Sequence, residues 1–219
     1  MRVLGFDPSL TNFGWALHDS DAVGPSRCLG RGRFQTSAKT LFIDRYTDMR
    51  DHLREHIEEM GVQYGVTRIG LEYPVFGDLW SEGMYGLFLY TCEALRLAKV
   101  DVVFFSPLQI KAHAREALNR PKGWKMMKPD MVEAAKKDSG GKGRWNHNEA
   151  DGYWAAAAGA RFWMFHDGVI GVDDLTPVER KHFTAFHTFT KGKKAGDTVF
   201  TGILHREDER FHRWSQEGL

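Results

Sequence analysis

The stretch from residue 2 to residue 17 constrains the fold more than any other. An apolar run ends at Asp7, a short polar turn follows, and a second apolar run extends from Phe13 to Leu17. This pattern predicts a two-stranded hairpin with a carboxylate at the end of its first strand. Strands hold such side chains more rigidly than loops do, but aspartate before proline is also ordinary turn chemistry. The hairpin alone leaves both roles of Asp7 open.

Length and cysteine content narrow the class of protein. With 219 residues the chain can form one large domain, or one domain with an extension, around a core that needs no covalent staples. Cys28 and Cys92 are far apart and form neither a disulfide framework nor a zinc pattern. The sequence shows no signal-peptide pattern and no apolar run of membrane-spanning length. We therefore expect a cytoplasmic protein without membrane association.

Alternating patterns give the order of the remaining elements. After the hairpin we expect a strand at 28–36, a helix at 42–60 ended by Gly61, a strand at 67–72, a helix at 81–99, a strand at 101–106 and helices up to residue 165. Three early strands followed by helix–strand units predict an α/β fold, with a mixed five-stranded sheet and helices on both faces.

Two features concern the outer parts of this fold. The predicted helix 81–99 carries a second apolar stripe, formed by Tyr85, Leu89 and Cys92, which predicts burial on two sides, against either a second subunit or the C-terminal segment. The character of the sequence changes near residue 167. We therefore expect one domain at 1–166 and an extension at 167–219, comprising a helix that starts at a capping box, a strand-like segment and a charged tail.

Three carboxylates stand where the predicted fold can bring them together. Asp7 and Glu72 each end a strand, and a helix capped by Asn146 carries Asp151. Helical spacing places Asp151 on one face with Asn148, three residues before it, and with His147, four before it. Converging carboxylates repel one another and favour a cation, and oxygen ligands suit Mg²⁺ or Mn²⁺ better than zinc. Two such ions about 4 Å apart can stabilise both the attacking and the leaving oxygen of a phosphodiester displacement.

A basic segment follows the fifth predicted strand. Between residues 111 and 144 there are ten lysines and arginines and four acidic residues, a local excess of six positive charges, although the whole chain has a net charge of +1. Lys111, Lys125 and Lys128 are candidates for neutralising phosphates of a nucleic acid. The alternative is a solvated charged helix face.

Two aromatic residues lie just past Glu72 in the sequence, the second of them four residues on. Tyr73 and Phe76 can stack on an unpaired base or wedge between bases. The alternative for each of them is packing in the core.

Several motifs in order carry a resemblance to a known family. They are Gly5-Phe6-Asp7-Pro8-Ser9 with Gly14, Leu71-Glu72 with Phe76, Ser106-Pro107 with Lys111, Lys128 before an apolar helix, and Glu149-Ala150-Asp151 opening an alanine-rich helix. Over roughly residues 1–166 the chain resembles the RuvC-type Holliday-junction resolvases of the RNase H-like superfamily. Its divergent loops and added C-terminal region resemble a phage-type member, which would act in the cytoplasm of a bacterial host.

The resemblance implies a metal site. In that family a strand aspartate, a glutamate on the fourth strand and two residues of the last helix hold two metal ions. The matching positions here are Asp7, Glu72, Asp151 and Asn148. The family usually has Asp or His where this chain has Asn148, so the fourth ligand is either the amide oxygen of Asn148 or the neighbouring His147. The resemblance also implies a homodimer, with helix 81–99 as a candidate interface, and four-way DNA junctions as substrate.

The leading hypothesis is therefore a crossover junction endodeoxyribonuclease that uses two Mg²⁺ or Mn²⁺ ions and no nucleotide cofactor. Flaps and replication forks are open as further branched substrates. Asn148 favours an alternative, a branched-DNA-binding protein that does not cleave. A second alternative is an actin-like phosphotransferase, because Gly5-Phe6-Asp7 with Gly14 also resembles a phosphate loop. The chain lacks the second glycine-rich loop that such an enzyme needs.

Overall fold

The computed structural model describes residues 1–73, 82–141, 143–184, 187–188, 198–199, 201–207 and 211–213. The strands are β1 (Arg2–Asp7), β2 (Asn12–Asp19), β3 (Cys28–Gln35), β4 (Arg68–Glu72), β5 (Asp101–Phe105), β6 (His187–Thr188), β7 (Thr198–Val199), β8 (Gly202–Leu204) and β9 (Phe211–Arg213). The helices are α1 (Phe42–Tyr64), α2 (Glu82–Leu97), α3 (Pro107–Ala117), α4 (Lys128–Ser139), α5 (His147–His166) and α6 (Pro177–Thr184), with short 3₁₀ turns η1 (Gly24–Arg27) and η2 (Val172–Asp174).

The main sheet has the strand order β3-β2-β1-β4-β5-β8-β9. β1, β4 and β5 run parallel, whereas β2, β3 and β8 are antiparallel to their neighbours. The predicted mixed sheet is confirmed, and its five expected strands are β1 to β5. The expected number of strands was too small, because β8 and β9 from the C-terminal segment extend the sheet beyond β5. Strands of three residues are too short to show a period in sequence.

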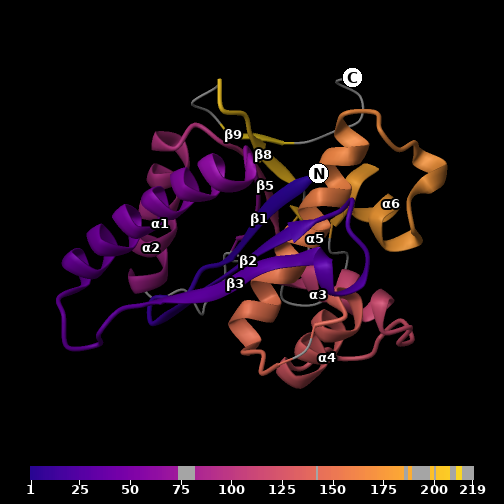
Figure 1. Ribbon diagram of the computed structural model, residues 1–219, viewed down its shortest axis with the longest axis horizontal. Coiled ribbons are helices and arrows are strands. Elements are labelled where there is room, and N and C mark those ends of the chain that lie inside the picture. Colours follow the sequence, from indigo (N-terminus) through magenta and orange to yellow (C-terminus); the bar gives the residue numbers. More distant parts are fainter. Residues whose placement is uncertain are drawn as a thin grey trace.

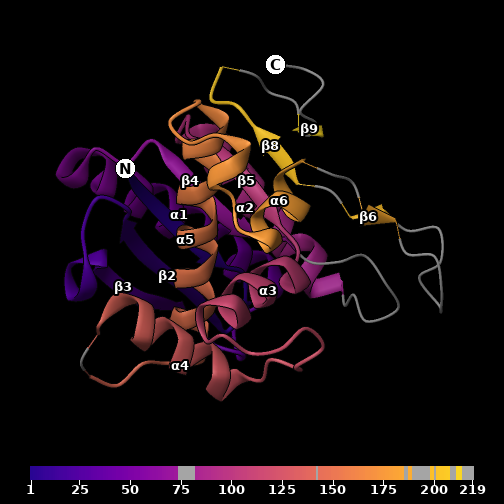
Figure 2. The same cartoon turned by 90° about the vertical axis from the view of Figure 1, so that its right-hand side faces the viewer.

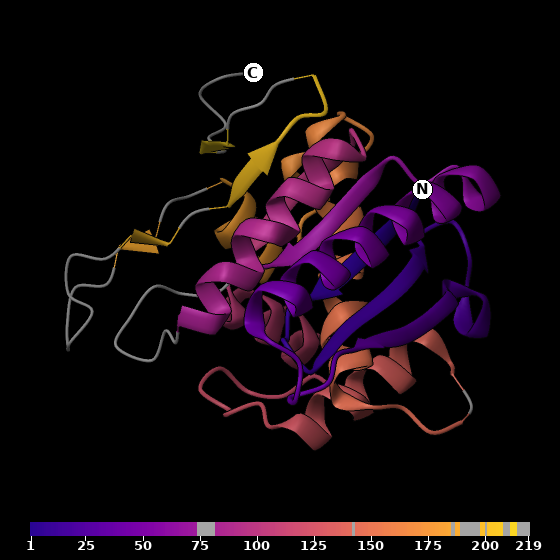
Figure 3. The ribbon, with the colours of Figure 1, turned by 90° about the vertical axis from the view of Figure 1, so that its left-hand side faces the viewer.

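Helices cover both faces of the sheet, as predicted (Figure 1). α1 and α2 lie side by side across one face (Figure 3), while α5 crosses the other, with α3, α4 and α6 packed outside it (Figure 2). Alternate strand residues divide between two cores. Leu4 and Phe6 of β1 belong to the cluster under α1 and α2, whereas Val3 belongs to the cluster under α5.

The central helix α5 lies unusually close to β1 and β2. Its alanine-rich sequence is buried on nearly all sides. A Cβ at Gly5 would lie 2.0 Å from the carbonyl oxygen of Gly152, and one at Gly14 would lie 2.1 Å from that of Asn148. The absence of side chains at these two glycines is therefore what brings the N-terminal half of α5 onto the hairpin.

Helix α1 is longer than its sequence suggests. The predicted end at Gly61 is wrong, because the helix continues to Tyr64 and ends at Gly65, whose φ of 69° is left-handed. Gly65 donates its backbone N–H to the carbonyl oxygens of Gly61 and Met60, as a helix-ending glycine does. Gly61 is therefore an interior helix residue.

Helix α2 has the two apolar sides expected of it. Leu87 and Leu95 are buried against the core, whereas Tyr85 and Leu89 are 49 % and 50 % exposed. Cys92 does not belong to the exposed stripe, because it is buried. The described part of the C-terminal segment makes no extensive contact with α2, and the half-exposed side chains of this stripe face outward.

The described part of the C-terminal segment packs on the same core as the rest of the chain. The predicted capping box is present: Glu179 donates its backbone N–H to the Thr176 hydroxyl, and Thr176 donates its own to the Glu179 carboxylate. Phe183 of α6 and Ile203 of β8 join the cluster under α5. Division of the chain after residue 166 stays a proposal. No helix in the described ranges has the length and apolar character needed to cross a membrane.

Candidate active site

Two of the predicted carboxylates end neighbouring parallel strands. The register pairs Phe6 with Leu71, so the next residues, Asp7 and Glu72, stand side by side at the same sheet edge. Adjacent strands are about 4.8 Å apart. Because Leu4, Phe6, Ile69 and Leu71 all point into the core under α1 and α2, alternation turns both carboxylates toward α5.

Asp151 completes an acidic cluster from the other side. It lies on the second turn of α5, next to Gly152, which contacts the hairpin. Burial raises the pKa of Asp7 well above its usual range, and the negative charges of Glu72 and Asp151 raise it further. Burial and the charge of Asp151 raise the pKa of Glu72 to about 8, and burial raises the pKa of Asp151 to about 6. The three carboxylates thus share one desolvated site.

The chemistry of this cluster fits a hard divalent cation. The Oδ1 atom of Asp151 is buried and has no hydrogen-bond partner among the described residues. Such an atom is costly unless a donor or a cation satisfies it. Carboxylate oxygens are the ligands that Mg²⁺ and Mn²⁺ prefer. Within the described ranges, no group of three or more His, Cys, Asp or Glu side chains is placed so that it could hold a metal ion without rearrangement.

Two lysines lie over the acidic cluster. Lys111, on α3, lowers the pKa of all three carboxylates, and Lys128, at the start of α4, lowers those of Asp7 and Asp151. α3 is capped by Ser106, whose hydroxyl accepts the backbone N–H of Gln109 in a capping box. Both lysines are exposed. They can therefore bind a phosphate close to the carboxylates whose negative charge they partly compensate.

The two candidates for the fourth ligand are held differently. Asn148 is buried, and its Nδ2 donates to the backbone carbonyl of Asn12 at 2.6 Å, which ties α5 to the hairpin turn. Its amide oxygen is the atom left for a metal. The Nζ atom of Lys128 lies 3.0 Å from Nε2 of His147. Burial, Lys128 and Arg33 lower the pKa of His147, so the neutral ring accepts a hydrogen bond from Lys128.

The remaining predicted residues are less close to the cluster. Tyr73 donates its backbone N–H to Phe105, and its half-buried ring packs against the core under α1 and α2. Burial raises the pKa of its hydroxyl. Lys125 is exposed and makes no hydrogen bond or ion pair within the described ranges. Phe76 lies outside the described residues.

Sequence reasoning missed one basic residue, Arg33, and placed Arg144 in the basic segment without singling it out as a site residue. An open groove of about 760 Å³ is lined by Arg33, Lys128, Val132, Arg144, Trp145 and His147, together with the first turns of α4 and α5. We call it the basic groove. Arg33 lies on β3. The sequence signal that could have found it is the alternation of arginines along this strand, at Arg31 and Arg33. Both arginines pair with Glu149 of α5, at 3.2 and 3.8 Å.

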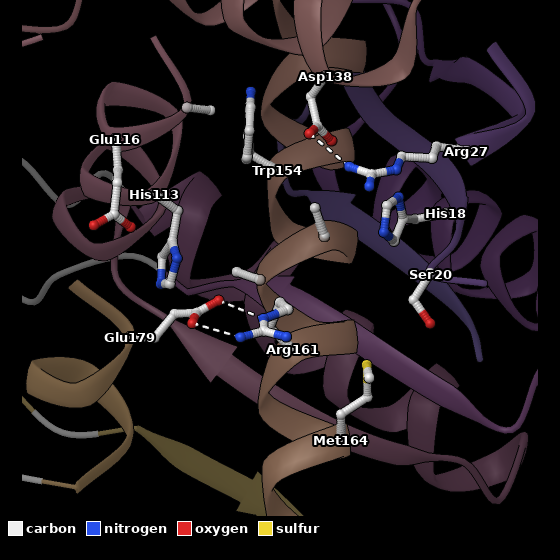
Figure 4. Close-up of a pocket in the computed structure, with 13 residues that line it drawn as sticks. His18, Ser20, Arg27, His113, Glu116, Asp138, Trp154, Arg161, Met164 and Glu179 are labelled. Atoms are coloured by element: carbon white, nitrogen blue, oxygen red, sulfur yellow. Dashed lines mark hydrogen bonds and ion pairs between the residues drawn. The ribbon is translucent and has the colours of Figure 1, made fainter. Parts of the chain in front are cut away.

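A second cavity, of about 290 Å³, lies at the other end of α5, with side chains of β2, α3, α4 and α6 pointing into it (Figure 4). Its two arginines are already paired with carboxylates. Arg27 pairs with Asp138 at 2.9 Å, and Arg161 makes two hydrogen bonds to Glu179, at 2.7 and 2.9 Å. These ion pairs brace η1 against α4 and α6 against α5, so the cavity presents no unpaired cluster of charges.

Comparison with solved structures identifies the fold. The Thermus thermophilus RuvC structure superposes with a TM-score of 0.56 at 18% identity, covering 71% of this chain and 91% of that one. T. thermophilus RuvC in complex with a Holliday junction substrate gives a TM-score of 0.54 at 19% identity, covering 71% and 90%. The chain has the RuvC fold. It matches no family model, and no curated protein is similar to it in sequence. The RuvC-like, RNase H-like architecture predicted from the motifs is thus confirmed at the level of the fold.

Proposed function

We propose that this protein is a metal-dependent endonuclease that cleaves phosphodiester bonds at Holliday junctions and other branched DNA. The observation that carries the proposal is the convergence of Asp7, Glu72 and Asp151 at one sheet edge, where burial raises the pKa of each and neighbouring negative charges further raise those of Asp7 and Glu72. The RuvC fold supports the substrate class, since one solved RuvC is bound to a Holliday junction substrate.

In this proposal the carboxylates hold two Mg²⁺ or Mn²⁺ ions. Asp7 would contact both ions, and Glu72 and Asp151 would each hold one. The amide oxygen of Asn148, or His147 after release of Lys128, would complete the set. Bound ions of this kind generate a nucleophilic water and neutralise charge on the leaving oxygen. The rigid ends of β1 and β4 fix the carboxylates before substrate arrives.

The two lysines and the exposed side of α2 supply the remaining parts of the proposal. Lys111 and Lys128 would bind phosphates flanking the scissile bond, which predicts DNA binding that weakens steeply with salt.

Tyr85, Leu89 and Leu97 are each about half exposed along α2 and would form the interface of a homodimer. A dimer would place two such sites on the two-fold-related strands of a four-way junction.

The test is a labelled four-way junction incubated with the protein in Mg²⁺. We expect paired nicks near the crossover with the wild type, and none in EDTA or with Asp7→Asn. Control incubations with a linear duplex, a flap and a fork define the substrate. An intact junction in every divalent metal, or equal cutting by Asp7→Asn, would contradict the proposal.

One observation favours a second function, branched-DNA binding without cleavage. Asn148 replaces a residue that is usually ionisable, and its amide nitrogen is committed to the Asn12 carbonyl. Tight, structure-selective binding of a junction that stays uncut in Mg²⁺ and Mn²⁺ would support that function instead.

A further inference from the structure

The basic groove continues directly from the acidic cluster. Asp7 of β1 pairs with Gly14 of β2, and Gly14 pairs with Arg33 of β3, so the three residues form one row across the sheet. Directly opposed residues share a face. A Cβ at Gly14 would point at Asn148, and Arg33 approaches Glu149, so this row faces α5. Two strand spacings separate Arg33 from Asp7, about 10 Å.

The groove carries an excess of positive charge. Arg33, Lys128 and Arg144 line it with one carboxylate, Glu149, which gives three positive charges minus one, or +2. Glu149 is already bound to Arg31 at 3.2 Å, to Arg33 at 3.8 Å and to the backbone N–H of Asn146. Arg144 is exposed and makes no hydrogen bond or ion pair within the described part of the chain. The groove is therefore suited to an anion.

Lys128 belongs to both sites. Its charge acts on Asp7 and Asp151, and it also lines the groove next to His147. A chain of phosphates leaving the acidic cluster toward β3 would meet Lys128 first, and Arg33 and Arg144 beyond it. β4 and β5 lie on the opposite side of β1 from β3. A DNA strand in the groove would therefore leave the acidic cluster in one direction only, toward β3.

We propose that the basic groove binds the phosphate backbone of the cleaved DNA strand on one side of the scissile bond. This inference rests on the proposed nuclease function and adds the path of the strand. Phosphates of one strand advance about 3.4 Å per nucleotide along the helix axis, so a reach of about 10 Å corresponds to about three nucleotides. The basic side chains contact phosphates rather than base edges, which adds affinity without sequence preference.

Arg144→Gln is the primary test, because this side chain is exposed and makes no described contact that folding needs. Binding of a four-way junction is measured in an Asp7→Asn background over a range of salt concentrations. Each lost phosphate contact lowers the slope of log affinity against log salt by about 1. We expect that loss for Arg144→Gln and about twice that loss for the Arg33→Gln/Arg144→Gln pair. Lys99→Gln, which removes an exposed charge at the opposite end of the sheet, is the matched control and keeps the wild-type slope.

Phosphate position is tested with methylphosphonate substitutions. Neutral linkages placed one, two and three nucleotides from the cut, on its 5′ or its 3′ side, should weaken binding on one side only. The same substitutions should have little further effect in the Arg33→Gln/Arg144→Gln protein. Thermal unfolding confirms that the variants are folded.

The possible failures are distinguishable. If the otherwise wild-type protein neither binds nor cuts branched DNA, the proposed function fails. If it binds and cuts, but Arg144→Gln and the double variant keep its affinity and salt slope, the groove proposal alone is overturned. Equal effects of neutral linkages on both sides of the cut would also overturn the proposed strand path.

Discussion

At the scale of single residues, the acidic cluster is a source of instability that the proposed bound cations would remove. Asp7, Glu72 and Asp151 have raised pKa values because burial disfavours their charged forms, and neighbouring negative charges add to this effect at Asp7 and Glu72. Without metal, the folded protein is therefore strained at neutral pH by the residues proposed to give it activity. Functional sites commonly carry such a cost.

The pH dependence of stability reports this strain. Between the ordinary value of 4.5 and the native value of about 8 for Glu72, the folded state binds more protons than the unfolded state. Its contribution therefore lowers stability as pH rises through that window. Thermal unfolding in EDTA should give Glu72→Gln a melting temperature several degrees above that of wild type at pH 8, and no such difference at pH 4. For a chain of this size, about 1 kcal/mol of stability corresponds to 2–4 °C in melting temperature.

Comparing the two proteins at each pH cancels other titrating groups, such as His18 and His113, whose pKa values burial lowers. Addition of Mg²⁺ at pH 8 should raise the melting temperature of wild type more than that of Glu72→Gln. Parallel pH curves for the two proteins would contradict the raised pKa of Glu72.

Substitutions at the two candidate ligands separate their roles. If the amide oxygen of Asn148 holds a metal, Asn148→Ala should lower cleavage about 10- to 100-fold, the range seen when supporting groups of metal sites are removed. Asn148→Asp should retain cleavage activity, and that activity should change when the metal concentration is raised. His147→Ala should lower cleavage less, because in this structure His147 accepts a hydrogen bond from Lys128.

Single-turnover cleavage at several Mg²⁺ concentrations measures these effects. A larger loss for His147→Ala than for Asn148→Ala would assign the fourth ligand to His147 instead.

At the scale of secondary-structure elements, the position of α5 depends on residues without side chains. Gly5→Ala would place a Cβ 2.0 Å from the Gly152 carbonyl oxygen, which forces α5 away from β1. We expect a loss of about 3 kcal/mol in the free energy of unfolding, at the upper end of typical overpacking costs. Chemical denaturation followed by circular dichroism measures it.

Gly61→Ala is the matched control. Gly61 lies inside α1, and a Cβ there would meet only the Val66 carbonyl oxygen, at 3.4 Å. Removing a glycine from a helix interior gains about 0.5–1 kcal/mol. Equal stability of the Gly5→Ala and Gly61→Ala proteins would show that α5 can shift without cost.

At the scale of the whole molecule, the exposed apolar side of α2 predicts self-association. Tyr85, Leu89 and Leu97 are each about half exposed on this one helix. Leu89→Glu should convert a dimer into a monomer, measured by sedimentation over a range of concentrations. Val62→Glu, at a position 92 % exposed on α1, is the control and should leave association unchanged. A wild type that is monomeric at all concentrations would contradict the homodimer.

Local patterns in the sequence determined much of the fold. Alternation and helical period located β1 to β5 and the long helices, and capping residues located the starts of α5 and α6, because these signals act within a few residues of chain. The same patterns placed Asp7 and Glu72 at strand ends. The end of α1 was misplaced because two glycines, Gly61 and Gly65, compete as stop signals, and only the left-handed backbone of Gly65 decides between them.

Contacts between distant parts of the chain decided the rest. The pairing of β8 with β5, the Lys128–His147 contact, and the row from Asp7 through Gly14 to Arg33 join residues far apart in sequence. Such contacts leave no periodic pattern in any short stretch of the sequence, because they depend on strand order and register. The sequence by itself determined which carboxylates were available and on which elements they lie. Only the tertiary structure decided that they share one desolvated site, because burial and mutual repulsion exist only after β1, β4 and α5 have packed together.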